Sequence, residues 1–334
     1  MINRKKQKIL IIKLITLISL IALIIRIPKL NLFNHTHNAI EINEDLIDFE
    51  GFDNENGTSE PIIPNIVHLL YLQQPYIKFY QLVNILSIYF NHKPDFIYIH
   101  CDDCSFRRDK YFEILKNYKD IWQIIKIYKI PFKTTVFNKT YKWINHHRSD
   151  VWRLQLLMNY GGIYLDNDVY VVRNLNEYLK YEMVVSWDEP IELNGIGVQV
   201  YIAHRNARLL KAHFDSYRYD YNESSWFYNA GHVPARILSE YSYLAKKVRF
   251  KLGTWVHYVE ELFQMNNWND WKNFNTIHLM INHRYYMDKD AAIKEFDETN
   301  IWTFNKTYGT MARILLRKAN LLLPINNDQS IIID

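Results

Sequence analysis

The stretch SDVWRLQLLMNYGGIYLDNDVYVVRNL, residues 149–175, carries the pattern that decides the fold. Its first apolar residues recur at helical spacing, at Val151, Leu154, Leu157 and Met158, which predicts a helix over 150–160. Two of the nine glycines of the chain, Gly161 and Gly162, then stand together. They predict that the helix ends there and that the chain turns. The apolar residues 163–165 that follow predict a short buried strand.

Two carboxylates, Asp166 and Asp168, come directly after this strand with one residue between them. Alternate residues of an extended segment point the same way, so both acids could face one ligand. In open α/β sheets, ligands bind beyond the carboxyl ends of strands. Oxygen donors suit Mn²⁺ or Mg²⁺, which also keep positions open for phosphate oxygens. An isolated Asp-x-Asp is more often a solvated turn, but Asp150, Arg153 and the double glycine at fixed offsets favour a site.

The full spaced pattern is D-x-x-R-x-x-x-L-x-x-x-G-G-x-Y-x-D-x-D, formed by Asp150, Arg153, Leu157, Gly161, Gly162, Tyr164, Asp166 and Asp168. It resembles the DXD region of retaining glycosyltransferases of the family 32 type. That group includes yeast-type α-1,6-mannosyltransferases and animal α-1,4-galactosyl- and α-1,4-N-acetylglucosaminyltransferases. The resemblance implies a GT-A type α/β fold, in which a single nucleotide-sugar-binding domain has a mixed, mostly parallel sheet. It also implies Mn²⁺ or Mg²⁺ as the cofactor.

The resemblance implies roles for individual residues. The expected catalytic residues are Asp166, Asp168, Arg153 and Asp150. The expected metal ligands are Asp166, Asp168 and His278. The expected contacts to the donor are Tyr71, Asp150, Arg153, Tyr164, Asp166, Trp187 and Asn194.

Two of these roles rest on shorter segments. The opening I-I-P-N-I-V-H-L-L-Y, residues 62–71, resembles the I-P-K-I-I-H-x-x-W opening of the group. Tyr71 stands where the group has Trp, and its ring could stack on the donor base. The segment I-H-L-M-I-N around His278 resembles the group's H-L-W-N. His278 could complete the metal shell or contact the diphosphate, but a lone histidine beside apolar residues is usually a packed one, so its role stays open.

Length and charge limit the class of protein. A chain of 334 residues with 49% hydrophobic content can bury the core of one catalytic domain. Its 40 basic and 36 acidic side chains are scattered, so we expect no nucleic-acid partner. No complete glycine-rich phosphate loop occurs, and the phosphates of a donor would be held by a metal and cations instead.

The N-terminus divides into a basic tail, residues 1–8, and an apolar stretch, residues 9–27. An apolar stretch of this length can cross a hydrocarbon layer of about 30 Å, and the basic residues favour a cytosolic N-terminus. These features predict a single-pass type II protein of the Golgi membrane. A cleavable signal peptide is the alternative, but no small-residue cleavage site follows.

We divide the rest of the chain by composition. The polar residues 28–60 predict a stem, 61–290 a lumenal catalytic domain, and 291–334 a helical tail that packs on it. Lumenal placement also agrees with five Asn-x-Ser/Thr sequons, at Asn34, Asn56, Asn138, Asn222 and Asn305. The only two cysteines, Cys101 and Cys104, are too few for a zinc site and predict a small-loop disulfide.

Together these features predict transfer of a hexose or N-acetylhexosamine from a nucleotide diphosphate sugar to a hydroxyl of a glycan or glycolipid. A UDP-sugar is favoured, and GDP-mannose is the other candidate donor. Two alternatives remain. The segment I-Y-L-D-N-D-V, residues 163–169, also fits the first strand of haloacid-dehalogenase-like phosphatases, although here about a hundred domain residues precede it. A membrane-anchored lectin without catalysis is the other.

Overall fold

The protein is described by a computed structural model that covers residues 48–187, 195–253, 258–284 and 293–321. The chain divides into two units, Met1–Leu46 and Ile47–Asp334, and the description below concerns the second. The predicted tail 1–8, the predicted membrane span 9–27 and Asn194 lie outside the described residues. Within the described ranges, no helix has the length and apolarity needed to cross a bilayer.

A seven-stranded sheet forms the centre of this unit, in the order β10-β8-β9-β6-β1-β2-β3. Its strands are β1 (Ile66–Tyr71), β2 (Phe96–Cys101), β3 (Ile125–Lys129), β6 (Gly162–Leu165), β8 (Met183–Ser186), β9 (Gly197–Ala203) and β10 (Lys246–Val248). Only β9 runs against its neighbours β6 and β8; the other pairs are parallel. The predicted α/β fold with a mixed, mostly parallel sheet is therefore confirmed.

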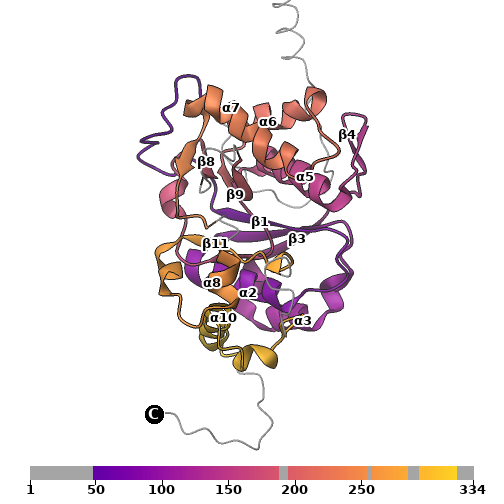
Figure 1. The fold of residues 1–334 in the computed structure, drawn as a ribbon, viewed down its shortest axis with the longest axis vertical. Coiled ribbons are helices and arrows are strands. Elements are labelled where there is room, and N and C mark those ends of the chain that lie inside the picture. The colour runs from indigo at the N-terminus through magenta and orange to yellow at the C-terminus, as the bar shows by residue number, and fades with distance from the viewer. Residues whose placement is uncertain (1–47, 188–194, 254–257, 285–292, 322–334) are drawn as a thin grey trace, which may run out of the picture. The chain divides into compact units, whose positions relative to one another are not determined.

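Helices cover both faces of the sheet, which explains why β1 is buried along its whole length. On one side, at the top of Figure 1, lie α5 (Ile144–Tyr160), α6 (Arg208–Tyr219) and α7 (Val233–Glu240). On the other side lie α2 (Phe79–Ser87), α3 (Lys110–Asn117), α8 (Tyr258–Phe263) and α10 (Thr307–Lys318). The short helix α4 (Lys119–Ile124) leads into β3.

Two small antiparallel sheets complete the unit. One pairs β7 (Val169–Val171) with β11 (Thr276–His278), and the other pairs β4 (Thr135–Val136) with β5 (Lys139–Thr140). The first pair brings a late segment of the chain beside the two carboxylates that follow β6. The register sets His278 opposite Val169.

The N-terminal boundary of the domain differs from the sequence-based division, whereas α10, within the predicted helical tail, packs on the domain as expected. Residues 48–60, assigned to the stem, pack into the unit, because Phe49 is buried and the Asn54 amide donates to the buried carboxylate of Glu182. At the other end, α10 buries Met311 and its neighbours, and the Tyr170 hydroxyl donates to the Met311 carbonyl. Segments outside 61–290 therefore contribute to the core.

The double glycine allows β6 to approach β1 closely. Gly161 and Gly162 have φ values of +65° and +113°, which L side chains rarely adopt. A Cβ atom on Gly162 would lie 2.6 Å from the Ile66 carbonyl oxygen. The Gly161 carbonyl is also 2.9 Å from Nε2 of the buried His68. Only glycine fits this turn.

A disulfide joins Cys101 to Cys104 at the end of β2, as predicted. Between them, Asp102 makes two kinds of contact. Its Oδ1 accepts a hydrogen bond from the Gln73 N–H at 2.7 Å, and its Oδ2 lies 2.9 Å from Nη1 of Arg148. Both side chains of this ion pair are almost completely buried. The loop after β1 and the helix α5 are thereby attached to the end of β2.

We predict that Gly162→Ala destabilises the protein much more than Gly51→Ala. Gly51 also has a positive φ, of +74°, but a Cβ atom there would meet nothing within 4 Å. The control therefore carries only the backbone strain, about 1 kcal/mol. The clash at Gly162 should add about 1 to 3 kcal/mol. Urea unfolding of both variants measures the difference, and equal midpoints would contradict the steric argument.

Candidate active site

A cavity of about 730 Å³ opens beyond the carboxyl ends of β1 and β6. Its walls come from the end of β1, helix α5, the turn between β6 and β7, strand β9, and two later segments around Trp226 and His278. Six predicted site residues line it together, namely Asp150, Arg153, Tyr164, Asp166, Asp168 and His278. The cavity therefore lies at the edge of the sheet where a ligand is expected.

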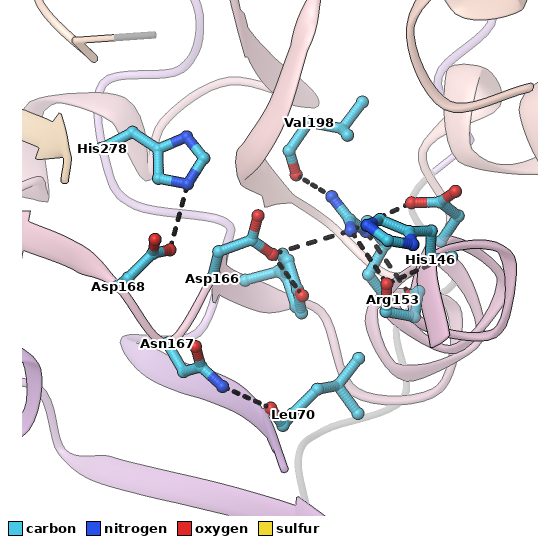
Figure 2. A network of polar contacts seen from close by, with 11 residues as sticks. Leu70, His146, Arg153, Asp166, Asn167, Asp168, Val198 and His278 are labelled. Atoms are coloured by element: carbon cyan, nitrogen blue, oxygen red, sulfur yellow. Dashed lines mark hydrogen bonds and ion pairs between the residues drawn. The ribbon is translucent and has the colours of Figure 1, made fainter. Parts of the chain in front are cut away.

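Arg153 lies at the centre of the polar network in Figure 2. Its Nη2 atom is 3.0 Å from Asp150 Oδ1 and 3.6 Å from Asp166 Oδ1, and its Nη1 donates to the Val198 carbonyl. The guanidinium also lies 4.8 Å from the ring centroid of Tyr164. Burial opposes the charge, but these neighbours outweigh it and raise the pKa of Arg153 further. The side chain is a permanent buried cation that orients the acids.

Asp150 shares this cation with Asp166 and is itself almost fully buried. Burial raises the pKa of Asp150 to about 7, although Arg153 acts in the opposite direction. Its Oδ2 atom has no hydrogen-bond partner in the described part of the chain. A carboxyl that lines the cavity with one oxygen unsatisfied can bind a hydroxyl group of a ligand.

Asp166 is held on the same side of the cavity. Its Oδ1 accepts a hydrogen bond of 2.6 Å from the Tyr164 hydroxyl, two residues earlier on β6. The side chain keeps 27% of its surface exposed. Asn167, the residue between the acids, turns away and donates its amide to the Leu70 carbonyl at 3.3 Å. Figure 2 shows this alternation, in which Asn167 points toward β1.

Asp168 is fixed from the opposite side. Its Oδ1 lies 3.0 Å from Nε2 of His278, and its Oδ2 accepts from the Ile281 N–H at 3.2 Å. Burial alone would raise the pKa of Asp168, but His278 and the Ile281 N–H lower it overall. Burial likewise opposes the charge on His278, and Asp168 outweighs it and raises the pKa of that imidazole. The pair thus favours a carboxylate beside an imidazolium.

These side chains fit a divalent cation by chemistry. Two carboxylates and one imidazole on one cavity wall are ligands that Mn²⁺ accepts. As they stand, however, Asp168 is paired with His278 while Asp166 is turned toward Arg153 and Tyr164. Accordingly, no group of three or more His, Cys, Asp or Glu side chains within the described ranges is already arranged around one point.

The other predicted donor contacts lie elsewhere. Tyr71 is fully buried with its ring edge-on to Phe106, at 5.4 Å between centroids, and it does not line the cavity. Successive residues of a strand face opposite sides, so its neighbours Leu70 and Leu72 reach the cavity instead. Trp187, after β8, is 8% exposed and packs near Lys247, away from the cavity. The donor role of Asn194 stays a prediction.

Several lining residues have no counterpart in the sequence analysis. Gln199 is 5% exposed, and its Nε2 atom lacks a hydrogen-bond partner among the described residues. Its carbonyl accepts from the Asp166 N–H at 2.9 Å, so it lies directly beside the DXD segment. A lone polar residue in the apolar run G-V-Q-V-Y-I-A was the available signal. For Trp226 and His146, which also line the cavity, no local pattern gave a signal.

Residues 81–185 match the sequence model of the family described as "Glycosyltransferase sugar-binding region containing DXD motif". The chain carries a DXD glycosyltransferase region. The predicted resemblance is confirmed by this match, which includes the helix α5, the double glycine and both acids.

Individual proteins are similar as well. Glucan organizing enzyme 1 of Cryptococcus neoformans var. grubii is 29% identical over 131 residues, which cover 36% of this chain. The matched stretch spans about a third of that relative's length, 32%.

Solved structures of glycosyltransferases also resemble the chain. The glycosyltransferase GlyE of Streptococcus pneumoniae TIGR4 gives a TM-score of 0.41 at 11% identity, covering 77% of this chain and 64% of its own. The galactosyltransferase LgtC with donor and acceptor sugar analogues gives 0.39 at 12% identity, covering 78% and 98%.

We predict that the stability advantage of Asp150→Asn over the wild type grows with pH. The folded-state pKa of Asp150, about 7, is above its ordinary value of 3.8. The unfolded chain therefore releases this proton first, and the folded wild type loses stability as pH rises from about 4 to about 7. The amide does not titrate. Urea unfolding at several pH values measures the difference, which should level off above pH 7; a difference independent of pH would contradict the raised pKa.

Proposed function

We propose that this chain is a metal-dependent glycosyltransferase that moves a hexose or N-acetylhexosamine from a nucleotide diphosphate sugar to a hydroxyl of a glycan or glycolipid. The single observation that carries the proposal is the position of the two acids. Asp166 and Asp168 follow β6 at the edge of the sheet, line one cavity, and are each held by separate partners. The DXD region that contains them supports the same reaction class.

The buried network around Arg153 would bind the donor sugar. Asp150 and Gln199 line the cavity, and each has one polar atom without a hydrogen-bond partner among the residues that the structure describes, so they can bond sugar hydroxyls. Arg153 is a positioning residue, because its contacts are to Asp150, Asp166 and Val198. It holds positive charge beside the place where the diphosphate departs. Fixed charges of this kind need no rearrangement during the reaction.

Asp166, Asp168 and His278 are the residues that would hold a divalent cation. Glycosyltransferases with a DXD motif generally use one, and we favour Mn²⁺, with Mg²⁺ as the other candidate. When bound, the cation would neutralise negative charge on the departing diphosphate. Without the cation, the imidazole of His278 keeps Asp168 ionised, since it lowers the pKa of that carboxyl. We propose retention of the anomeric configuration, and a UDP-sugar before GDP-mannose.

We also propose that the chain is a single-pass type II protein of the Golgi membrane, anchored through residues 9–27, with the catalytic domain in the lumen. The basic tail, the apolar stretch and the five sequons support this placement. The disulfide Cys101–Cys104 agrees with an oxidising compartment. The name of the fungal relative refers to glucan, which supports a glycan as the class of acceptor.

We predict that Asp168→Asn lowers turnover of the donor by about 100-fold or more, because a charged ligand and its pairing with His278 are lost. The full-length chain is tested against a panel of UDP- and GDP-sugars with and without Mn²⁺, and the release of nucleotide is measured. Binding of Mn²⁺ should also weaken in the same variant, and the electron paramagnetic resonance signal of Mn²⁺ measures this.

The matched control is Asp215→Asn, at a partly exposed acid on α6 that pairs with Arg218 at 3.4 Å and does not line the cavity. It should leave turnover within about twofold of the wild type, as surface substitutions usually do. Unchanged activity of Asp168→Asn would remove the acid pair from the reaction. Hydrolysis of phosphomonoesters without use of sugar nucleotides would favour the phosphatase alternative, and glycan binding without turnover of any donor would favour the lectin.

A further inference from the structure

A row of aromatic rings lies at the mouth of the cavity and has no role in the donor site described above. Ring centroids are 6.2 Å apart between Trp143 and His146, 6.0 Å between His146 and Trp226, and 6.3 Å between Trp226 and His283. We call these four residues the aromatic row. Three of them, His146, Trp226 and His283, line the cavity.

The aromatic row is exposed to an unusual degree for indole rings. Trp226 and Trp143 keep 48% and 43% of their surface accessible. Single exposed apolar residues need no explanation, but a contiguous exposed row beside a cavity marks a binding surface. Its members come from three segments far apart in the sequence: the start of α5, the loop after α6, and the segment after β11. The fold therefore brings these rings together at this one place.

The row passes close to the reacting end of the proposed donor site. Burial lowers the pKa of both His146 and His283, and the Asp166 carboxylate acts on both in the opposite direction. Each ring thus lies within electrostatic reach of Asp166. Figure 2 shows the imidazole of His146 beside the guanidinium of Arg153. A ligand stacked on Trp226 would lie next to the acid that faces the donor.

Polar groups flank the rings on α5. Asn145 and Ser149 are one helical turn apart and both line the cavity. A flat apolar face bordered by amide and hydroxyl groups matches a pyranose ring, which has an apolar C–H face and hydroxyl groups around its edge. The composition of this surface therefore corresponds to a sugar and not to a purely apolar ligand.

We propose that Trp226 is the stacking platform for the acceptor, a pyranose of a glycan, with Asn145 and Ser149 bonding its hydroxyl groups. This inference rests on the proposed function and adds to it the place and the chemical class of the acceptor. A nucleobase is the other planar ligand that a Trp could hold. The geometry favours the acceptor. A nucleotide is expected at the carboxyl ends of the parallel strands. The residues that line the cavity there, such as Leu70 and Leu72, do not belong to the aromatic row.

The test compares Trp226→Ala with Trp226→Tyr in the full-length chain, with methyl α-mannopyranoside, methyl β-galactopyranoside and methyl β-glucopyranoside as acceptor probes. Trp226→Ala should raise the KM of the accepted glycoside by about tenfold or more, while the KM of the donor changes far less. Trp226→Tyr should restore most of the affinity. Tyr219→Ala removes a ring that is 74% exposed and does not line the cavity, and should change neither value.

Binding is followed independently of turnover by saturation-transfer NMR. Saturation of the pyranose C–H protons should appear with the wild type and disappear with Trp226→Ala. If no donor is turned over by any form, the proposed function fails, and this measurement still decides whether a pyranose binds at Trp226. An acceptor KM and NMR signal unchanged by Trp226→Ala would overturn the inference. So would an equal rise in the donor KM, which would place the nucleobase on this ring.

Discussion

One buried cation, the guanidinium of Arg153, joins the elements on which the cavity depends. It comes from α5 and contacts Asp166 at the end of β6 and the Val198 carbonyl on β9. Burying a charge without partners costs several kcal/mol. These elements therefore cannot move apart without leaving the Arg153 charge exposed to water or buried without partners. The same cation serves a second acid, Asp150. Burial raises the pKa of Asp150, the nearby Asp166 carboxylate adds to the rise, and Arg153 opposes it.

The two acids of the motif are attached to different parts of the protein. Asp166 is attached to α5 and β9 through Arg153. Asp168 is attached to β11 through His278 and to the segment after β11 through the Ile281 N–H. They lie on a turn closed by the Val169 N–H, which donates to the Asp166 carbonyl at 3.0 Å, and between them Asn167 turns back to β1. The position of one acid relative to the other is therefore set by how two packed regions fit together, and not by the short turn alone.

Much of the fold could be predicted because it depends on local pattern. The continuous apolar run of β1, the double glycine after α5 and the spacing of the acids are each visible in adjacent residues. The spaced pattern also predicted that Asp150, Arg153 and Tyr164 lie together, and they line one cavity. The position of Tyr71 could not be inferred from resemblance, because a strand offers its residues to alternate sides and the loop after β1 decides which reach the cavity. Gln199 is marked locally as the lone polar residue of an apolar run, whereas Trp226 reaches the cavity only through long-range packing, which no local spacing records.

The disulfide at the end of β2 has a consequence for how the protein matures. It closes a ring of backbone around Asp102, whose carboxylate contacts both the Gln73 N–H and the guanidinium of Arg148. Gln73 precedes a cavity residue, Gln74, and Arg148 stands two positions before Asp150. Oxidation of the thiols restricts the backbone that carries this carboxylate. Because Arg148 lies on α5, we expect a chain with reduced thiols to hold this helix less firmly against the end of β2.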